Sequence, residues 1–497
     1  MAAHAAMRAV IDPRQPVLVG VGTCQQLEND FQLAQEPMDL MLQAVRRAGV
    51  DAGAAEALSG VQSIAVPKGR WRYQNPAGEI ARAIGADSAA TVLASVGVLQ
   101  QTLIGNACLR IANGEIHSAL IAGADAGHRI LNARRAGVRA TERQQDDTPD
   151  VVMEAADALL HPAELAAGIR MPVALYAVLA SAWRARHGLS VEAHRSQMGA
   201  LYASFSAIAA ANPEAWLRQP LDALDISKAS ERNPMQAFPY TRRHCTSWNV
   251  DQSAALLLCS AGRAQALGIP SVRWVYPLAS TESNHMTAVS ARASLSSCAG
   301  ARLAGAAALN ASGLLPTQLD LIELYSCFPV AVEMVAEALG IETTRDVTIT
   351  GGMPFAGGPF NNYVLQATCR MAQLIREGRG RAGLVSSVSG IMTKQGFGIW
   401  ASQPSANGFA FKDVSAETAA CEGVKEVDSH FAGAAVVAGY TVLHDKDQLP
   451  RALVLANTAA GTRTLAWSKD PAVAQRLQSS EFCGAAITVQ DGVFAPA

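Results

Sequence analysis

One short segment constrains the fold of this chain more than any other feature. Residues 118–124 read SALIAGA, without the alternation of polar and apolar side chains that a sheet with one solvent-facing surface shows. A strand that is apolar on both faces belongs in the middle of a sheet that helices cover on both sides. Residues 253–261, SAALLLCSA, form a second such strand or the end of a buried helix. The sequence therefore predicts an α/β protein.

Helices and strands alternate along most of the chain. Residues 16–22, PVLVGVG, predict a buried strand, and residues 37–49 then carry apolar side chains at helical spacing, with a proline at the start and a glycine at the end. We predict two α/β halves, the first over residues 1–262 and the second over residues 263–402. A less regular stretch, about residues 135–250, is expected to be an insertion in the first half.

The composition changes at residues 401–410, ASQPSANGFA, which are typical of a linker. Beyond them, strand-rich segments are separated by turns, as in small barrels and sandwiches. We therefore predict an additional β-rich domain over residues 411–497, of an OB-like or split-barrel type.

Charge and cysteine content exclude several classes of protein. The 497 residues carry a formal net charge of −2, which gives no electrostatic signature of nucleic-acid binding, and no apolar run is long enough to span a membrane. The nine cysteines are odd in number and form no CxxC, so we expect reduced thiols in the cytoplasm, no metal site and no tightly bound cofactor. A GxG at residues 20–22 lacks the third glycine of a dinucleotide site, because Gln25 replaces it.

Three motifs in chain order resemble those of the thiolase superfamily, and most of all the sterol-carrier-protein-type thiolases and the thiolase-like proteins of type 1. They are NGEIHSALIAG at 113–123, ELYSCF at 323–328, and TGGMPFAGGP at 350–359. The resemblance covers nearly all of residues 15–400. It implies the thiolase fold, with two related halves in α-β-α-β-α layers and a loop insertion. It also implies a CoA thioester as substrate or ligand, and a homodimer through the thiolase core.

The same resemblance implies that the catalytic set of an ordinary thiolase is missing. The position of the nucleophilic cysteine is Gly97, that of the loop histidine is Gly358, and that of the second cysteine falls near Val388. Tyr325 and Ser326 replace a histidine and its acidic neighbour in the ELYSCF motif. Each lost acid or base is worth roughly 10² to 10⁴ in rate. We therefore expect no ordinary thiolysis or Claisen condensation.

Several residues can still bind a thioester. Backbone N–H groups near Gly97 and Gly390 can form an oxyanion hole, because such a site does not depend on side chains. Asn361 and Asn362 can add amide donors or simply form a turn. Lys394 follows the last core strand and is either a ligand contact or a solvated side chain. The candidate substrate-binding residues are Gly97, Gly357, Gly358, Asn361, Asn362, Gly390 and Lys394.

Tyr325 and Cys327 are the candidate catalytic residues. They are two positions apart at the end of an apolar strand, so their side chains are expected on one face. Cys327 can equally be a core residue, because cysteine is among the most buried residue types. The adjacent His244 and Cys245 of RRHC do not count as a catalytic pair, because a nucleophile and its base are normally brought together by the fold.

Three functions are compatible with these residues. The first is cleavage of a C–C bond in a β-hydroxyacyl-CoA by a retro-aldol reaction, which needs no cysteine; some relatives on this scaffold use a tyrosine and an OB-fold partner protein. The second is non-catalytic binding or transport of acyl-CoA. The third is an acyltransferase in which another cysteine, such as Cys108 or Cys327, has taken over.

Overall fold

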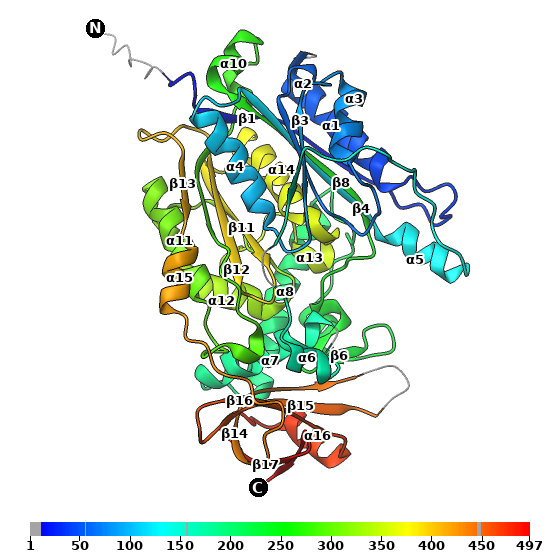
Figure 1. Cartoon of the computed structure of the whole chain (residues 1–497), viewed down its shortest axis with the longest axis vertical. Helices are drawn as coiled ribbons and strands as arrows, with labels where there is room; N and C mark the ends of the chain where they lie inside the picture. Colours follow the sequence, from blue (N-terminus) through cyan, green and yellow to red (C-terminus); the bar gives the residue numbers. More distant parts are fainter. Residues whose placement is uncertain (1–10, 55, 156–157, 170, 445–448) are drawn as a thin grey trace.

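The computed structural model describes residues 11–497 except 55, 156–157, 170 and 445–448. Figure 1 shows two sheets and their helices in the upper part of the molecule and a smaller group of strands, orange to red, at the bottom. Helices from the middle of the chain, in cyan and green, lie between the two parts.

The first sheet has six strands, and its central members are completely buried. β1 pairs antiparallel with β8, β8 antiparallel with β4, and β4 parallel with β2. Every residue of β4 and β8 is buried, which confirms the central strand predicted over 118–124 and makes residues 253–260 a strand. In spatial order the strands are β1 (Pro16–Gln25), β8 (Asp251–Ser260), β4 (Ser118–Ala126), β2 (Ser63–Pro67), β3 (Ala90–Ala94) and β5 (Val151–Met153).

The second sheet repeats the arrangement of the first. β9 pairs antiparallel with β12, β12 antiparallel with β11, and β11 parallel with β10, in the order that β1, β8, β4 and β2 follow in the first sheet. The two related α/β halves are thus confirmed. In spatial order the strands are β10 (Leu321–Glu323), β11 (Ala382–Ser389), β12 (Lys394–Ala401), β9 (Tyr276–Ser283) and β13 (Ala410–Asp413).

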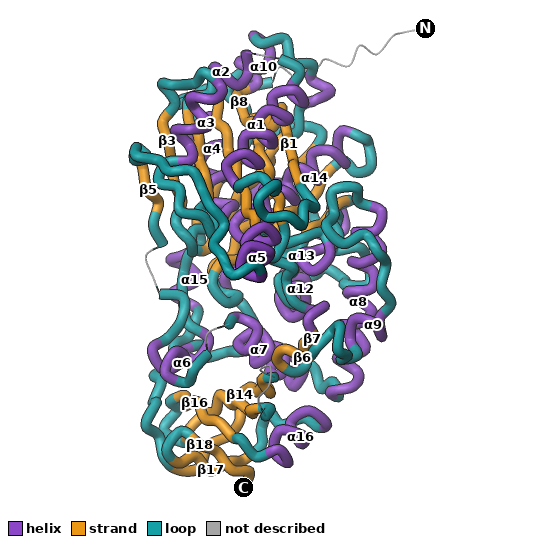
Figure 2. The backbone as a smooth tube through the Cα atoms, turned by 90° about the vertical axis from the view of Figure 1, so that its right-hand side faces the viewer, coloured by secondary structure: helices purple, strands orange, loops and turns teal. Residues whose placement is uncertain are grey.

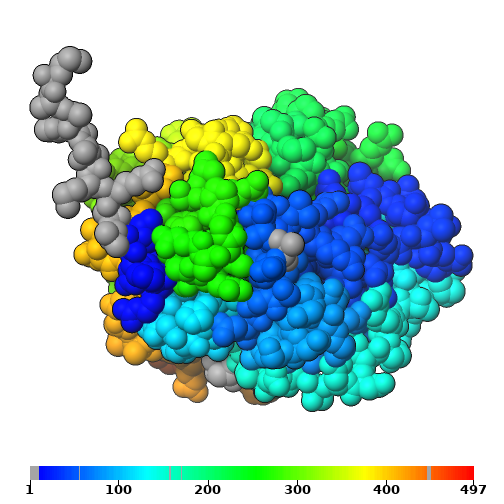
Figure 3. Space-filling model, turned by 90° about the horizontal axis from the view of Figure 1, so that it is seen from above, coloured from blue at the N-terminus to red at the C-terminus, as the bar shows by residue number. Residues whose placement is uncertain are grey.

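Helices form three layers around the two sheets. α4 and α14 contact strands of both sheets and lie between them, α1 and α3 cover the outer face of the first sheet, and α11 covers the outer face of the second, with α12 packed beside it. The layering is therefore α-β-α-β-α, as predicted. Figure 3, seen from above, shows the first half (blue and cyan) beside segments of the second half (yellow and orange). The helices are α1 (Pro37–Ala52), α3 (Pro76–Ile84), α4 (Gln100–Ala112), α11 (Ala299–Ser312), α12 (Pro329–Leu339) and α14 (Tyr363–Arg376).

The first helix ends later than the sequence predicts. Gly49 was expected just past its end, but α1 continues to Ala52 and is terminated by Gly53, whose φ of +73° favours glycine. Gly49 lies inside the helix, and a Cβ there would be 2.5 Å from Leu58 Cδ1, so close packing rather than helix termination accounts for this glycine. The short helices elsewhere are α2 (Glu56–Ser59), α10 (Ala261–Ala266), α13 (Gly352–Phe355) and α15 (Ser415–Cys421).

The insertion occupies the whole stretch between β4 and β8, residues 127–250. It begins earlier than the predicted residue 135, because α5 follows β4 directly. β5 also belongs to it and pairs with β3 at the edge of the first sheet. Its remaining elements are α5 (Gly127–Arg135), α6 (Pro162–Ala166), α7 (Pro172–Arg186), α8 (Val191–Ala211), α9 (Ala223–Ser227), β6 (Met235–Ala237) and β7 (Tyr240–Thr241).

The C-terminal strands close into the predicted small barrel. β14 pairs with both β15 and β17, and β15–β16–β18–β17 completes the ring of five strands. The barrel has its own cluster of buried apolar side chains. Its elements are β14 (Gly433–Leu443), β15 (Arg451–Thr458), β16 (Arg463–Ser468), α16 (Pro471–Ser479), β17 (Ala486–Gln490) and β18 (Val493–Pro496).

The barrel begins later than residue 411 and is not separate from the core. The predicted boundary falls inside β13, which pairs with β9 of the second sheet, and α15 packs on α11. The first barrel strand starts only at Gly433. In addition, β6 and β7 of the insertion extend the barrel sheet beside β14. The loop over 402–409 connects β12 to β13, and both of these strands belong to the second sheet.

Candidate functional site

A cavity of about 780 Å³ lies where loops of both halves face the insertion. Its walls include the segments that follow β3, β10 and β11, and the loop that precedes α14. Carboxyl ends of core strands are where α/β sheets usually bind ligands. The structure brings together six of the predicted site residues at this cavity, namely Gly97, Tyr325, Cys327, Gly358, Asn361 and Gly390.

Gly97, at the expected position of the nucleophile, lies in the loop between β3 and α4. Its φ is +102°, and a Cβ there would be 2.8 Å from the Cβ of Ala155. Its carbonyl oxygen accepts hydrogen bonds from Ser389 Oγ at 3.0 Å and Lys394 Nζ at 3.4 Å. Lys394 is buried and is not among the cavity-lining residues, so the structure shows it bound to this loop rather than solvated.

The loop that should carry the thiolase histidine has no room for one. A Cβ at Gly358 would lie 2.2 Å from Cγ2 of Thr246, and the hydroxyl of Thr246 donates to the carbonyl of Cys327 at 3.2 Å. The N–H of Gly358 donates a hydrogen bond to the carbonyl of Ser247 at 2.9 Å. Gly357 faces away from the cavity, since a Cβ there would be 2.2 Å from Gln252 Oε1. The glycines thus serve close packing of this loop on β8 and on the insertion.

The two asparagines of this loop differ in position. Asn361 lines the cavity, although its amide nitrogen already donates to the carbonyl of Lys68 at 2.8 Å. Asn362 is buried, and its hydrogen-bonding pattern places its amide nitrogen 2.9 Å from the Gly123 carbonyl and its oxygen 3.3 Å from the Ala254 N–H. The expected ligand contact at Asn362 is therefore replaced by a link between two core strands.

Tyr325 presents its ring to the cavity at the end of β10. Its backbone N–H donates to Ser386 Oγ at 2.8 Å, and its ring packs edge-on against Tyr363 with centroids 5.8 Å apart. Burial, with a smaller contribution from Cys327, raises the pKa of the phenol above its usual value of 10.0. No described residue forms a hydrogen bond with its hydroxyl group. Tyr325 is therefore a neutral hydrogen-bond donor that a ligand can reach.

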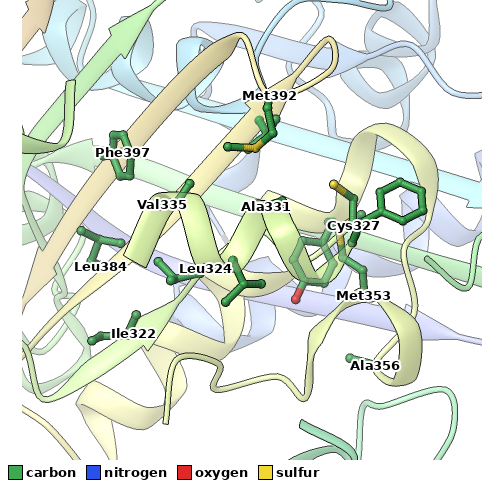
Figure 4. Close-up of a cluster of buried hydrophobic side chains, with 14 of the residues drawn as sticks. Ile322, Leu324, Cys327, Ala331, Val335, Met353, Ala356, Leu384, Met392 and Phe397 are labelled. Atoms are coloured by element: carbon green, nitrogen blue, oxygen red, sulfur yellow. The ribbon is translucent and has the colours of Figure 1, made fainter. Parts of the chain in front are cut away.

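Cys327 belongs both to the cavity wall and to the core. Figure 4 shows it in a cluster of buried apolar side chains with Leu324, Ala331 and Met353. Burial raises the pKa of its thiol to about 12, although a hydrogen bond with Tyr176 of α7 acts in the opposite direction. A thiol of this pKa is protonated near neutrality and is a poor nucleophile.

The RRHC segment does not provide a catalytic pair. Nδ1 of His244 accepts a hydrogen bond from the N–H of Thr241 at 3.2 Å and lies 3.0 Å from its hydroxyl oxygen, and burial lowers the pKa of His244 to about 3. The thiol of Cys245 donates to the Thr241 carbonyl at 3.4 Å, and burial raises its pKa to about 12. Both side chains are thus used within the turn. The neighbouring Arg242 and Arg243, however, line the cavity.

The outer part of the cavity is rich in arginine. The ion pairs recorded among described residues use other arginines, and no Asp or Glu occurs among the described residues that line the cavity. Trp248, 39% exposed, lies at the same rim. Sequence reasoning missed this feature because the residues come from separated segments, and only the adjacent pair in RRHC gave a signal. The arginines are Arg135, Arg232, Arg242 and Arg243.

Two other kinds of site are not found in the described part of the chain. No cluster of three or more His, Cys, Asp or Glu side chains there is arranged to hold a metal ion. Among the helices of that part, none is both long and apolar enough to cross a membrane.

Comparison with known proteins shows what the chain is similar to. The C-terminal region, residues 415–492, matches the family described as "Thiolase-like protein type 1 additional C-terminal domain". A monomeric SCP2-thiolase-like protein type 1 from Mycobacterium smegmatis is similar over 98% of this chain and 100% of its own, with 26% identity and a TM-score of 0.82. The C-terminal region is thus similar to the additional domain of thiolase-like proteins of type 1, and the chain as a whole is similar to a protein of that type.

More distant neighbours of this chain share the fold of its core. The Ltp2–ChsH2(DUF35) aldolase is 18% identical with a TM-score of 0.59, over 79% of this chain and 99% of its own. Human mitochondrial 3-ketoacyl-CoA thiolase in complex with CoA is 15% identical with a TM-score of 0.55, over 79% and 98% of the two chains. Comparison with curated proteins gives no match.

Proposed function

We propose that the cavity binds an acyl-CoA with the phosphates at the arginine-rich rim and the thioester at Tyr325. The observation that carries this proposal is the composition of the lining, which contains four arginines and no carboxylate among its described residues. Arginine binds phosphate through charge-assisted, often bidentate hydrogen bonds. Without acidic partners in the wall, these guanidinium groups are available for an anionic ligand.

The deeper part of the cavity suits an acyl chain. Apolar side chains from α7 and the segment before it, from the residue that precedes α12 and from the β11–β12 hairpin line the cavity together with the predicted site residues. The volume lies in the range of small-molecule sites. Trp248 at the rim offers a face for the adenine base. The apolar lining residues nearest these elements are Leu159, Met171, Val173, Phe328 and Ile391.

A retro-aldol cleavage is the reaction that we propose for this site. The C–C bond between the α and β carbons of a β-hydroxyacyl-CoA breaks, the hydroxyl proton leaves to a base, and the thioester enolate takes up a proton to give a carbonyl product and a shorter acyl-CoA. Tyr325 supports this as a hydrogen-bond donor to the reacting oxygen. The aldolase with a similar fold supports the reaction class by analogy.

A second candidate function is non-catalytic acyl-CoA binding. It is favoured by the absence of a base among four buried groups at the inner end of the cavity. Burial raises the pKa of Tyr176, Tyr325, Cys245 and Cys327. All four groups are then protonated near neutrality, and none of them is poised as a base. The displaced-acyltransferase alternative requires a reactive thiolate, which neither cavity cysteine provides.

Product analysis distinguishes these candidates. For an aldolase, Tyr325→Phe keeps octanoyl-CoA binding within the roughly tenfold worth of one hydrogen bond but lowers cleavage of a 3-hydroxyacyl-CoA by at least about 10². If wild-type protein binds the thioester and cleaves nothing, the binding function stands alone. Acyl transfer from acetoacetyl-CoA to CoA at a substantial rate would contradict both.

Other expectations remain proposals. We propose that the protein acts in lipid metabolism in the cytoplasm, without a tightly bound cofactor. We also propose that the barrel is OB-like, because it is a five-stranded closed barrel with α16 between its third and fourth strands.

A homodimer through the core also stays a prediction. β5 covers the β3 edge of the first sheet, so pairing of two cores there would use the outer edge of β5.

A further inference from the structure

The barrel contacts helix α7 of the insertion through a buried interface. Gly439 lets β14 lie directly on α7, since a Cβ there would be 2.8 Å from Val178 Cγ1. The N–H of Tyr440 donates to Ser181 Oγ at 2.8 Å. Arg184, almost fully buried, donates to the Tyr440 hydroxyl at 2.6 Å. The barrel therefore fixes α7 through both backbone and side-chain contacts, and Figure 2 shows the two elements adjacent at the lower end of the molecule.

Helix α7 in turn carries a wall of the cavity. Tyr176 lines the cavity, stacks on Phe328 with ring centroids 4.5 Å apart, and forms a hydrogen bond with the thiol of Cys327. Its hydroxyl also accepts from the N–H of Met392 at 3.3 Å. A displacement of α7 along the barrel would therefore move the groups that surround Tyr325.

A second route leads from the barrel to the β11–β12 hairpin. Met392 has a φ of +54°, which costs energy for a residue with a side chain, so the hairpin must be held by its surroundings. The guanidinium of the buried Arg292 donates to the carbonyl of Ile391 in this hairpin. The carbonyl of Arg292 accepts from Nη2 of Arg463, a barrel residue, at 3.0 Å. Arg463 thus acts on the cavity wall through one intermediate residue.

Arg463 is poorly explained by stability alone. It is 1% exposed, and its Nε and Nη1 have no hydrogen-bond partner among the described residues. Burial alone lowers the pKa of its guanidinium to about 10. Replacing a buried charge with an apolar side chain of similar size is often neutral or stabilising. An arginine at this position is therefore consistent with a role in placing the 291–293 segment.

The barrel sheet also continues into the rim of the cavity. The N–H of Phe238 donates to the Val442 carbonyl at 2.8 Å, and β6 and β7 extend this sheet. Arg242 and Arg243 follow β7 directly. Three parts of the cavity, namely α7, the hairpin and the arginine-rich rim, are therefore tied to the barrel.

We propose that the C-terminal barrel positions the walls of the acyl-binding cavity, and that Arg463 and Arg184 are its positioning residues. The barrel is then part of the site's architecture rather than an independent module. This inference rests on the proposed function only for the identity of the ligand. The arrangement of Tyr176, Cys327 and the hairpin does not depend on it.

The test compares Arg463→Met with Arg476→Met. Arg476 lies within the barrel, over the ring of Phe482, and has no recorded side-chain contact with the core. The readout is the alkylation rate of Cys327 by iodoacetamide, measured by peptide mass spectrometry relative to the exposed Cys421. We expect Arg463→Met to raise the relative rate at least threefold, with a Tm change below about 4 °C, and Arg463→Lys to restore the wild-type rate. Arg476→Met should leave the rate unchanged.

A second variant keeps the test decisive if Arg463→Met does not fold. Glu481→Gln removes the carboxylate that accepts a hydrogen bond from Arg184 Nε at 2.8 Å. Because Glu481 lies at the surface of the barrel, this variant is expected to fold. It should also raise alkylation of Cys327. Equal rates in wild type, Glu481→Gln and Arg463→Met would overturn the proposal. Alkylation needs no ligand. A failure of acyl-CoA binding would therefore contradict the proposed function but would not affect the test of the barrel's role.

Discussion

At the scale of single residues, tight packing around two glycines is the main feature of the site. Gly97 and Gly358 are the positions where the family resemblance predicts the nucleophile and the histidine of a thiolase, and in both places a Cβ would meet another side chain at less than 3 Å. The packing around both glycines therefore leaves little room for a larger side chain. Restoring single residues is expected to disturb the structure before it restores chemistry.

Gly358→His tests this directly. The new Cβ would collide with Thr246, whose hydroxyl is fixed by the Cys327 carbonyl, so we expect a loss of about 1–3 kcal/mol in the free energy of unfolding and no thiolysis of acetoacetyl-CoA. Urea denaturation and a thiolysis assay measure the two effects. Gly358→His combined with Thr246→Ala should recover stability. A stable Gly358→His variant with thiolase activity would show that the loop tolerates the missing base.

The sequence predicted residue positions better than residue roles. Tyr325 and Cys327 were placed on one face because their spacing matches the end of a strand, and both line the cavity. The role of Asn362 could not be deduced, since its amide binds strands β4 and β8 that are more than a hundred residues distant. The arginine-rich rim was missed for the same reason, because its members converge only through the fold.

At the scale of elements, the predicted start of the C-terminal domain at residue 411 lies close to residue 415, where the match to an additional C-terminal domain begins, but the barrel strands start later. The Ser, Pro, Asn and Gly residues of 401–410 were interpreted as a linker and do form a loop, but composition does not reveal what a loop connects. β13 after this loop returns to the second sheet, and barrel strands start only with β14. The alternation of helices and strands, in contrast, is a local pattern, and it predicted the two halves correctly.

Limited proteolysis tests the revised boundary. Cleavage in the loop over 402–409 should give two fragments that elute together in size-exclusion chromatography without denaturant. The reason is that β13 pairs with β9 and the barrel packs on α7. In denaturant the same fragments should separate. A C-terminal fragment that dissociates as a folded unit under native conditions would contradict this description and would support an independent domain.

At the scale of the whole molecule, arginine side chains gather at one cavity. The chain has a net charge of only −2. The described residues that line its cavity nevertheless include four arginines and a histidine and no Asp or Glu. Two α/β halves and the insertion supply the cavity, while the barrel contacts the elements that form three of its parts. This arrangement is consistent with the proposed binding of an acyl-CoA on a thiolase fold.

Isothermal titration with octanoyl-CoA tests the central claim, that an acyl-CoA binds with its phosphates at the arginine-rich rim. Arg242→Gln combined with Arg243→Gln should weaken binding at least about 30-fold, since each charge-assisted hydrogen bond is worth about 1.5–3 kcal/mol. Arg379→Gln, at an exposed arginine that does not line the cavity, is the matched control and should bind like wild type. Octanoyl-pantetheine, which lacks the nucleotide, should bind weakly to all three proteins. Unchanged affinity in the double variant, or no binding to the wild type, would contradict the account.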